Sequence, residues 1–232
     1  MFGIKTKIKR KIFELIDGKF LVSESKVQKL MHHFQADEYG HRANFERADL
    51  GYGWIHYGFL RTIKPKNVLC VGSRHGYIPA VLAQACKDNG FGHVDFVDAG
   101  FGLEDDSHWT GEGYWKTNEG KSVFLRFDLQ NFITLHVMKT TKFEKISRKK
   151  IKYDYIYIDG DHSYEGALRD YELFWPMLRE GGFISFHDIS IKGKKPEGDY
   201  GVWKVWKKIA KKNAISLDFL GSGLGILQKK TN

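Results

Sequence analysis

From residue 66 onward, short apolar runs alternate with longer segments in which apolar residues recur every three or four positions. Short apolar runs bounded by turn residues are typical of buried strands, and the longer periodic segments are typical of helices. Five runs are expected to be strands: NVLCVG (67–72), HVDFVD (93–98), ITLHVM (133–138), YDYIYID (153–159) and FISFHD (183–188).

Three segments between and after these strands have helical periodicity, namely 77–90, 163–182 and 202–213. Gly90 and the pair Gly181 and Gly182 are expected to end the first two helices. Near the C-terminus, residues 215–220 and 224–229 are joined by GSG, which predicts a hairpin of two final strands. Strands that alternate with helices indicate an α/β fold with a mainly parallel sheet, to which the hairpin adds an antiparallel strand.

The composition fits one large domain. The chain has 232 residues, of which 42% are hydrophobic and 15% aromatic, and only 4 are proline. We expect an α/β domain over residues 63–232, preceded by a helical extension over residues 1–62 that acts as a lid or in substrate or dimer contacts. Residues 2–17 form a basic amphipathic pattern. Three roles stay open for it: packing on its own domain, packing on a second copy in a homo-oligomer, and weak contact with a membrane surface.

The cysteines and the net charge bear on the cellular compartment and on the partners to be expected. Cys70 and Cys86 lie in apolar patterns, which indicates buried thiols in a reducing compartment rather than a disulfide framework. No apolar run is long enough to span a membrane, so we expect a cytoplasmic protein. The net charge is +9 and the pI about 9.3, from lysine-rich clusters that fit solvated surfaces but also attract anions. No nucleic-acid motif accompanies them, and nucleic acid is not the expected partner.

Polar residues at the ends of the first two strands indicate a ligand. Gly72 follows the first strand and Gly76 precedes the next helix, and glycine permits a tight turn and close approach of a ligand. Asp98 ends the second strand, where a carboxylate accepts hydrogen bonds from ribose hydroxyls or caps the following turn. The pattern favours an adenosine-type ligand. It is not G-x-G-x-x-G, and it does not separate S-adenosylmethionine from NAD.

The fourth and fifth strands end in Asp159 and Asp188. If these strands are neighbours, their tips lie about 5 Å apart. Two such carboxylates repel each other unless a cation lies between them or one is protonated. Oxygen ligands without cysteine favour Mg²⁺ or a similar divalent ion. His162, three residues after Asp159, is placed to accept a proton.

Two neighbours of these residues keep more than one interpretation. Asp161 stands where an acid often caps the following helix, and it is equally a candidate site residue. His187, directly before Asp188, is either a strand-end histidine bonded to backbone, a group that supports a ligand, or a ligand itself.

The block YDYIYIDGDHSYEGALRDYELFWPMLREGGFISFHD (153–188), after the turn VLCVGSRHG (68–76), resembles the class I S-adenosylmethionine-dependent methyltransferases. More narrowly, it resembles the branch that contains macrolide-sugar O-methyltransferases of the macrocin and mycinamicin type and the cephalosporin hydroxylase-like proteins. The resemblance covers about residues 66–190. It implies a Rossmann-like, doubly wound fold with a seven-stranded, mainly parallel sheet and an antiparallel C-terminal hairpin strand.

The resemblance also implies roles. The cofactor turn maps to Gly72, Ser73 and Gly76, and the ribose-binding acid to Asp98.

For the reaction, the resemblance makes Asp159 a catalytic metal ligand and His162 the general base. Relatives end the next strand with an acidic pair. Here it reads His187–Asp188, so only Asp188 carries over as a metal ligand. A second departure is Cys70, where many relatives place an acid that contacts the cofactor.

The expected function is S-adenosylmethionine-dependent methyl transfer to a hydroxyl of a sugar or another small polar acceptor, including an anionic one. An acceptor held in line and a base suffice for that step. Three alternatives stay open: an RNA-binding or RNA-modifying methyltransferase that uses the basic surface, a family member that binds the cofactor without catalysis, and an NAD-dependent oxidoreductase.

Three segments are candidate walls of the acceptor site. The loop 100–120 offers Trp109, Tyr114 and Trp115, either over the cofactor or in ordinary packing. Residues 46–61 are expected to form a helix with Trp54, His56 and Tyr57 as weaker candidates. The Lys- and Gly-rich segment 190–203 is expected to be a mobile flap over the acceptor.

Overall fold

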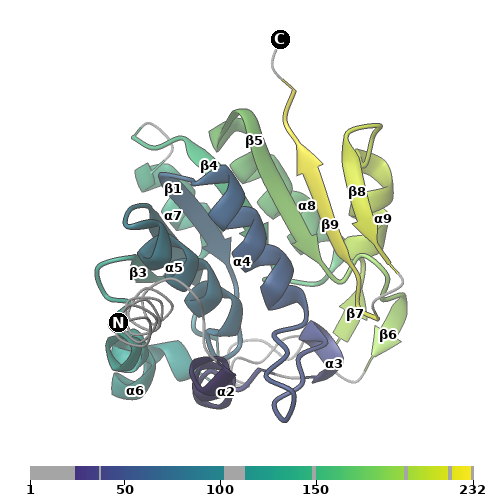
Figure 1. Ribbon diagram of the computed structural model, residues 1–232. Coiled ribbons are helices and arrows are strands. Elements are labelled where there is room, and N and C mark those ends of the chain that lie inside the picture. Colours follow the sequence, from purple (N-terminus) through teal and green to yellow (C-terminus); the bar gives the residue numbers. More distant parts are fainter. Residues whose placement is uncertain are drawn as a thin grey trace, which may run out of the picture.

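A seven-stranded sheet organises the chain. The computed structural model describes residues 24–36, 38–101, 113–147, 150–195, 198–218 and 221–230. The strand order is β3-β2-β1-β4-β5-β9-β8 (Figure 1). The strands are β1 (Asn67–Val71), β2 (His93–Asp98), β3 (Ile133–Val137), β4 (Tyr153–Ile158), β5 (Leu178–His187), β8 (Ala214–Leu217) and β9 (Leu224–Gln228). Strand β9 pairs antiparallel with β5 and β8, and the other pairs are parallel. The expected fold class is confirmed.

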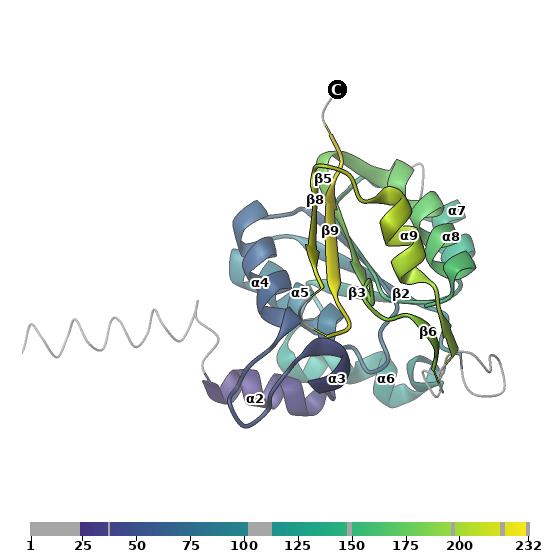
Figure 2. The same ribbon diagram turned by 90° about the vertical axis from the view of Figure 1, so that its right-hand side faces the viewer.

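Helices cover both faces of the sheet, as Figure 2 shows. On one face lie α2 (Glu24–His33), α4 (Tyr52–Ile63) and α5 (Tyr77–Asn89), and on the other α7 (Thr140–Ser147), α8 (Tyr164–Phe174) and α9 (Val202–Ile209). Along β1, Val68 and Cys70 enter the core on the first face, whereas Leu69 and Val71 enter the core on the second. Burial on both faces explains why the parallel strands read as continuous apolar runs.

The remaining elements are short. They are α3 (Glu38–His41), η1 (Tyr114–Lys116), α6 (Asn118–Ser122), η2 (Val123–Phe127), η3 (Trp175–Met177) and a separate two-stranded ribbon of β6 (Gly193–Lys195) and β7 (Gly198–Tyr200). None of the helices in the described part of the chain is long and apolar enough to cross a membrane.

The expected helix over 163–182 was too long. Helix α8 ends at Phe174, because Pro176 lacks the N–H that a continuing helix needs and lies instead in a short 3₁₀ turn. The glycine pair therefore does not end the helix but lies inside β5. Gly181 has a φ of +73°, and the register with β4 shifts between Tyr153 and Tyr155.

Other boundaries also differ. Helix α4 begins at Tyr52 rather than near residue 46, because Gly51, with a φ of +55°, packs so close to the His41 carbonyl that a Cβ would collide with it. Helix α9 ends at Ile209, four residues early. Helix α7 had no counterpart among the expected elements.

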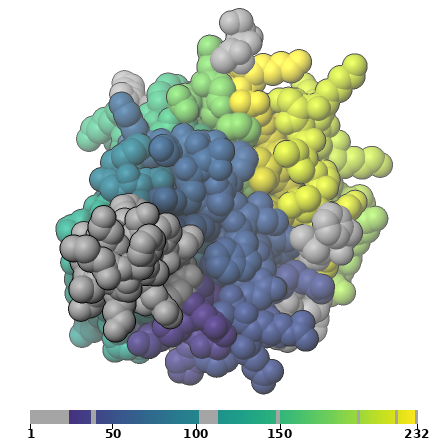
Figure 3. Space-filling view, in the orientation of Figure 1, coloured from purple at the N-terminus to yellow at the C-terminus, as the bar shows by residue number. Residues whose placement is uncertain are grey.

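Residues 24–63 belong to the body of the molecule. Helix α4 lies beside α5 (Figures 1 and 2), and in Figure 3 the purple-to-blue surface of this segment covers the lower and central part of the face shown. The boundary between 62 and 63 stays a prediction. The amphipathic pattern over 2–17 lies outside the described residues.

Candidate active site

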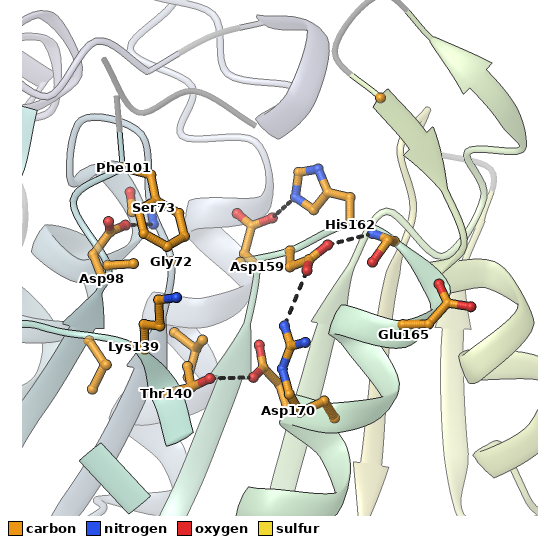
Figure 4. A pocket seen from close by; sticks show the side chains of 18 of the residues that line it. Gly72, Ser73, Asp98, Phe101, Lys139, Thr140, Asp159, His162, Glu165 and Asp170 are labelled. Atoms are coloured by element: carbon orange, nitrogen blue, oxygen red, sulfur yellow. Dashed lines mark hydrogen bonds and ion pairs between the residues drawn. The ribbon is translucent and has the colours of Figure 1, made fainter. Parts of the chain in front are cut away.

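A cavity of about 770 Å³ opens at the carboxyl ends of β1, β2 and β4. In this sheet β1 is flanked by β2 on one side and β4 on the other, so the cavity lies where the strand order reverses. Figure 4 shows Gly72, Ser73 and Asp98 on one side of the cavity and Asp159 and His162 on the other. A volume of this size is typical of a site for a cofactor-sized small molecule.

The turn after β1 is built by two glycines. Gly72 has a φ of +76°, and a Cβ there would lie 2.2 Å from the Asp159 carbonyl oxygen. Gly76 has a φ of +91° and faces the Trp115 ring. Ser73 Oγ accepts a hydrogen bond from the Gly76 amide (3.0 Å). Gly72 and Ser73 line the cavity, whereas Gly76 is not among its lining residues and shapes the turn from behind.

Asp98 lines the cavity and also ties two loops together. Its carboxylate accepts hydrogen bonds from the amides of Ser73 (3.1 Å) and Gly100 (2.7 Å). Burial raises the pKa of Asp98 to about 6, against the lowering effect of those two amides. Because the Asp98 carboxylate accepts these backbone hydrogen bonds and also lines the cavity, a role as turn cap does not exclude contact with a ligand.

Asp159, directly after β4, is surrounded by donors. Tyr157 donates a hydrogen bond to its carboxylate (2.9 Å), and the ring nitrogens of His162 and His187 lie 3.2 and 3.3 Å from Oδ1. Burial alone would raise the pKa of Asp159. The positive charge of His187 and hydrogen bonds from three histidines, His41 among them, hold it well below its usual value instead.

Asp188 meets Asp159 as the strand ends predicted, because β4 and β5 are neighbours in parallel register. Asp188 Oδ2 lies 3.3 Å from His162 Nε2. Ligand atoms of Asp159, His162 and Asp188 all lie within 4.8 Å of one another. Burial lowers the pKa of His162, but Asp188 and Asp159 outweigh burial and raise it above its ordinary value.

His187 is fixed between the carboxylates and the N-terminal segment. Its Nδ1 lies 3.1 Å from Asp188 Oδ1 and 3.3 Å from Asp159 Oδ1, and its Nε2 donates to the Gly40 carbonyl (2.8 Å). Burial opposes a positive charge on this ring, yet the two carboxylates raise the pKa of His187 well above its ordinary value.

His41, from α3, completes this cluster and was not foreseen. Its ring stacks on that of His187 with centroids 5.1 Å apart, and its Nε2 lies 3.9 Å from Asp159 Oδ2. No periodicity or spacing links residue 41 to the strand ends, so the sequence carries no signal for it.

Asp161 has the structural partners of a turn residue, although it also lines the cavity. It accepts hydrogen bonds from the Ser163 amide (3.0 Å) and from Arg169 (3.1 Å), while Ser163 itself caps α8 through the Gly166 amide.

The candidate aromatic walls are mostly core residues. Trp115 is fully buried and donates to the Ser73 carbonyl (2.7 Å), and His56 is fully buried against Tyr155. Tyr57 donates to Asp88 (2.7 Å). None of these lines the cavity, nor do Tyr114, His75 and Trp54. Trp109 lies outside the described residues.

Two parts of the cavity wall have another origin. From the expected flap, Gly198, Asp199 and Tyr200 line it, and the Tyr200 ring stacks on His162 with centroids 5.0 Å apart. Around the start of α7, Lys139, Thr140 and Thr141 line it beside the buried Asp170 of α8. The sequence interpretation missed this part of the wall because it missed α7.

A family model described as "Methyltransferase domain" matches residues 69–189, which include both carboxylate-bearing strand tips. No curated protein sequence matches the chain significantly.

Solved structures share the fold at low sequence identity. An O-methyltransferase from Bacillus cereus in complex with SAH is 14% identical, with a TM-score of 0.61 and coverage of 94% of this chain and 97% of that one. Cofactor-bound Rv0187 from MTB is 12% identical, with a TM-score of 0.62 and coverage of 95% and 97%. The MycE methyltransferase of the mycinamycin biosynthetic pathway, in complex with Mg, SAH and mycinamycin VI, is 12% identical. Its TM-score is 0.54, with 88% of this chain and 53% of that one covered.

Proposed function

The chain belongs to the methyltransferase-domain family, and from that premise we propose that it transfers a methyl group from S-adenosylmethionine to a hydroxyl of a small polar molecule. The observation that carries the proposal is the position of His162, a titratable imidazole held beside two carboxylates at the edge of a cofactor-sized cavity. Fold neighbours named as O-methyltransferases support oxygen as the target atom.

The cofactor is assigned to the cavity between the turn after β1 and the start of α8. Gly72 and Ser73 give it close access to backbone, and Asp98 accepts hydrogen bonds from its ribose. Asp98 already accepts two backbone hydrogen bonds, so its carboxylate is held in one orientation before a ligand arrives. Fixed acceptors of this kind reduce the ordering cost of binding.

The chemistry needs a positioned acceptor and a proton acceptor. The acceptor oxygen forms a bond to the methyl carbon while the carbon–sulfur bond breaks and leaves a neutral thioether, and the hydroxyl proton passes to His162. Tyr200 stacks on the His162 ring and keeps it against the carboxylates.

Ligand oxygens of Asp159 and Asp188 lie within 4.8 Å of each other and fit a divalent cation between them. Such an ion would acidify and orient the acceptor hydroxyl. Magnesium is the ion that the family resemblance implies, and the MycE structure contains Mg.

The charge of the cavity wall bears on the acceptor. Among the described residues, three cationic side chains line it, Arg74, Lys139 and Arg169, against six carboxylates: Asp98, Asp159, Asp161, Glu165, Asp170 and Asp199. This excess of acids suits the positively charged sulfonium of the cofactor and a divalent cation, and a neutral hydroxylated acceptor such as a sugar needs no further counter-charge. The same excess disfavours RNA at this opening, whatever the lysines elsewhere on the surface bind.

The test has two steps. Calorimetric titration with S-adenosylmethionine, beside NAD, is expected to show micromolar binding of the first and none of the second. Incubation with neutral sugars and other hydroxylated acceptors, with and without a divalent ion, is then expected to release S-adenosylhomocysteine. If folded protein does not bind S-adenosylmethionine, the proposal fails. If it binds but methylates no hydroxyl, a cofactor-binding role without catalysis takes its place.

A further inference from the structure

His187 is held in an orientation that leaves one ring nitrogen facing the carboxylate pair. It is 4% exposed, so solvent does not satisfy its ring. Its Nε2 faces the Gly40 carbonyl, which only accepts hydrogen bonds, so this nitrogen carries a hydrogen. Ser222 Oγ donates to the same carbonyl (2.6 Å) and lies 3.1 Å from Nε2, which fixes this side of the ring further.

The other ring nitrogen has the spacing of a metal ligand. Nδ1 lies 3.1 Å from Asp188 Oδ1 and 3.3 Å from Asp159 Oδ1. An ion with bonds of about 2.1 Å to two ligands at a right angle holds those atoms about 3.0 Å apart. A histidine that ligates a metal also commonly donates its second ring N–H to a backbone carbonyl, as His187 does to Gly40.

We propose that His187 is a metal ligand through Nδ1, and that with Asp159 and Asp188 it forms a site for a first-row transition-metal ion rather than Mg²⁺. This inference rests on the divalent site of the proposed function. Mg²⁺ is bound almost wholly by oxygen, whereas imidazole suits ions such as Fe²⁺, Co²⁺ and Zn²⁺. A nitrogen ligand from His187 therefore selects which metal ion this site binds.

His162 keeps its separate role in this arrangement. Its Nε2 approaches the same two carboxylates, at 3.2 and 3.3 Å, but its ring stacks on Tyr200 of the cavity wall. Like Asp159 it lines the cavity, whereas His187 and Asp188 do not, so it lies on the cavity side of them, where a proton acceptor is needed.

A rival arrangement makes the opposite prediction. A positively charged His187 could itself neutralise the two carboxylates and take the place of a cation. The folded protein would then bind no divalent ion at these residues.

The experiment uses the full chain after treatment with a chelator. Calorimetric titrations with Co²⁺ and with Mg²⁺ are expected to show Co²⁺ binding at least about 100-fold more tightly, and the visible spectrum of bound Co²⁺ reports its ligands. In His187→Gln, an amide oxygen replaces the nitrogen, and the Co²⁺-to-Mg²⁺ affinity ratio is expected to fall at least about tenfold with a changed spectrum. His93→Gln, at the amino end of β2 and so at the opposite end of the sheet, is the matched control and leaves both affinities unchanged.

The wild-type ratio tests the proposal even if the variant does not fold. Equal affinities, or no binding of Co²⁺ to folded protein, overturn it, and so does a folded His187→Gln protein with the wild-type ratio and spectrum. If the loss of ratio and the spectral change occur in His162→Gln instead, His162 is the nitrogen ligand and the assignment of His187 is wrong. Binding of S-adenosylmethionine by the same samples shows whether the proposed function survives such a result.

Discussion

At the scale of single residues, His162 connects the site to a testable step. Burial lowers its pKa, but Asp188 and Asp159 raise it above the ordinary value, so the neutral, proton-accepting imidazole becomes more abundant as the pH rises above neutrality. Turnover measured without a divalent ion is therefore expected to increase with pH in that range, because no cation then offsets the two carboxylate charges. His162→Gln is expected to lower turnover by about 10²- to 10⁴-fold and to leave S-adenosylmethionine affinity within a few-fold of wild type. Initial rates from pH 6 to 9 and calorimetry measure both, with His93→Gln, at the amino end of β2, as the control.

Turnover by His162→Gln at the wild-type rate would remove this residue from the proton-accepting role. A loss of cofactor affinity that matches the loss of turnover would make it a structural residue instead.

Asp170 is a buried carboxylate in the cavity wall, and its ionisation lowers the stability of the folded chain. Burial raises its pKa to about 6, although Thr140 Oγ1 donates a hydrogen bond to it (2.8 Å) and the nearby charge of Arg169 favours ionisation. Between about pH 4 and 6 the folded chain thus binds more protons at this site than the unfolded chain. Stability falls as the pH rises through that window, and above it the ionised group costs up to about 3 kcal/mol.

Asp170→Asn removes that charge and keeps an oxygen for Thr140. We expect it to raise the free energy of unfolding without ligand by about 1–3 kcal/mol at pH 8, with the difference shrinking toward zero near pH 4. Urea unfolding at both pH values measures this. If Asp170→Asn lowered the free energy of unfolding equally at pH 8 and pH 4, the hydrogen bonds of the carboxylate would outweigh the cost of its desolvation.

The sequence predicted correctly that two carboxylates meet, because their positions follow from the order of the strands. Asp159 and Asp188 end neighbouring parallel strands, so their meeting required no knowledge of side-chain packing. Gly40 and His41 reach the same cluster from a segment far upstream, through a tertiary contact that no local pattern encodes. The roles assigned to Gly72, Ser73, Gly76 and Asp98 toward a cofactor stay predictions.

At the scale of elements, apolar periodicity located the strands well and the helix ends poorly. The central strands β1 and β4 are buried on both faces, which the sequence shows directly as continuous apolar runs. The end of α8 depended on Pro176 rather than on the more conspicuous glycine pair, which serves a bulge in β5. Helix α7 (TTKFEKIS) has only two large apolar residues, Phe143 and Ile146, too few for a periodic signal, whereas the equally short α9 (VWKVWKKI) has five.

The turn between β1 and α5 gives a test at this scale. A Cβ at Gly72 would lie 2.2 Å from a backbone oxygen of the β4 tip, and the φ of +76° disfavours other residues. Gly72→Ala is expected to lower the free energy of unfolding by more than about 2 kcal/mol. Gly58, inside α4, has no atom within 4 Å of an added Cβ, and Gly58→Ala is expected to raise it by about 0.5–1 kcal/mol.

Chemical denaturation of the two variants beside wild type measures both effects. A Gly72→Ala protein as stable as wild type would mean that the turn can move away from Asp159, and the close contact would then not define the cavity wall.

At the scale of the whole molecule, the carboxyl ends of the strands carry the cavity, and segments far apart in the sequence meet beside it. Gly40 and Ser222 both contact His187, so the segment before α4 and the loop before β9 meet over the carboxylates. Tyr52 adds a further contact between these two segments, because its hydroxyl accepts a hydrogen bond from the Gly223 amide (2.9 Å).

These contacts between the N-terminal segment and the rest of the chain bear on the expected domain boundary between residues 62 and 63. Leu30, Phe34, Tyr52 and Leu60 are buried in the same core as β1 and α5. Burial of each such side chain stabilises the fold by about 1.5–3 kcal/mol, so loss of all four approaches the whole stability of a typical domain, about 5–15 kcal/mol.

A chain of residues 63–232 is therefore expected to show no cooperative thermal transition and to self-associate. A chain of residues 24–232, which keeps every one of these contacts, is expected to melt cooperatively. Circular dichroism melts and size-exclusion chromatography of both separate the outcomes. Cooperative melting of 63–232 within a few degrees of the longer chain would make the N-terminal helices an accessory layer, and the sheet with α5 and α7 to α9 would then suffice as a folding unit.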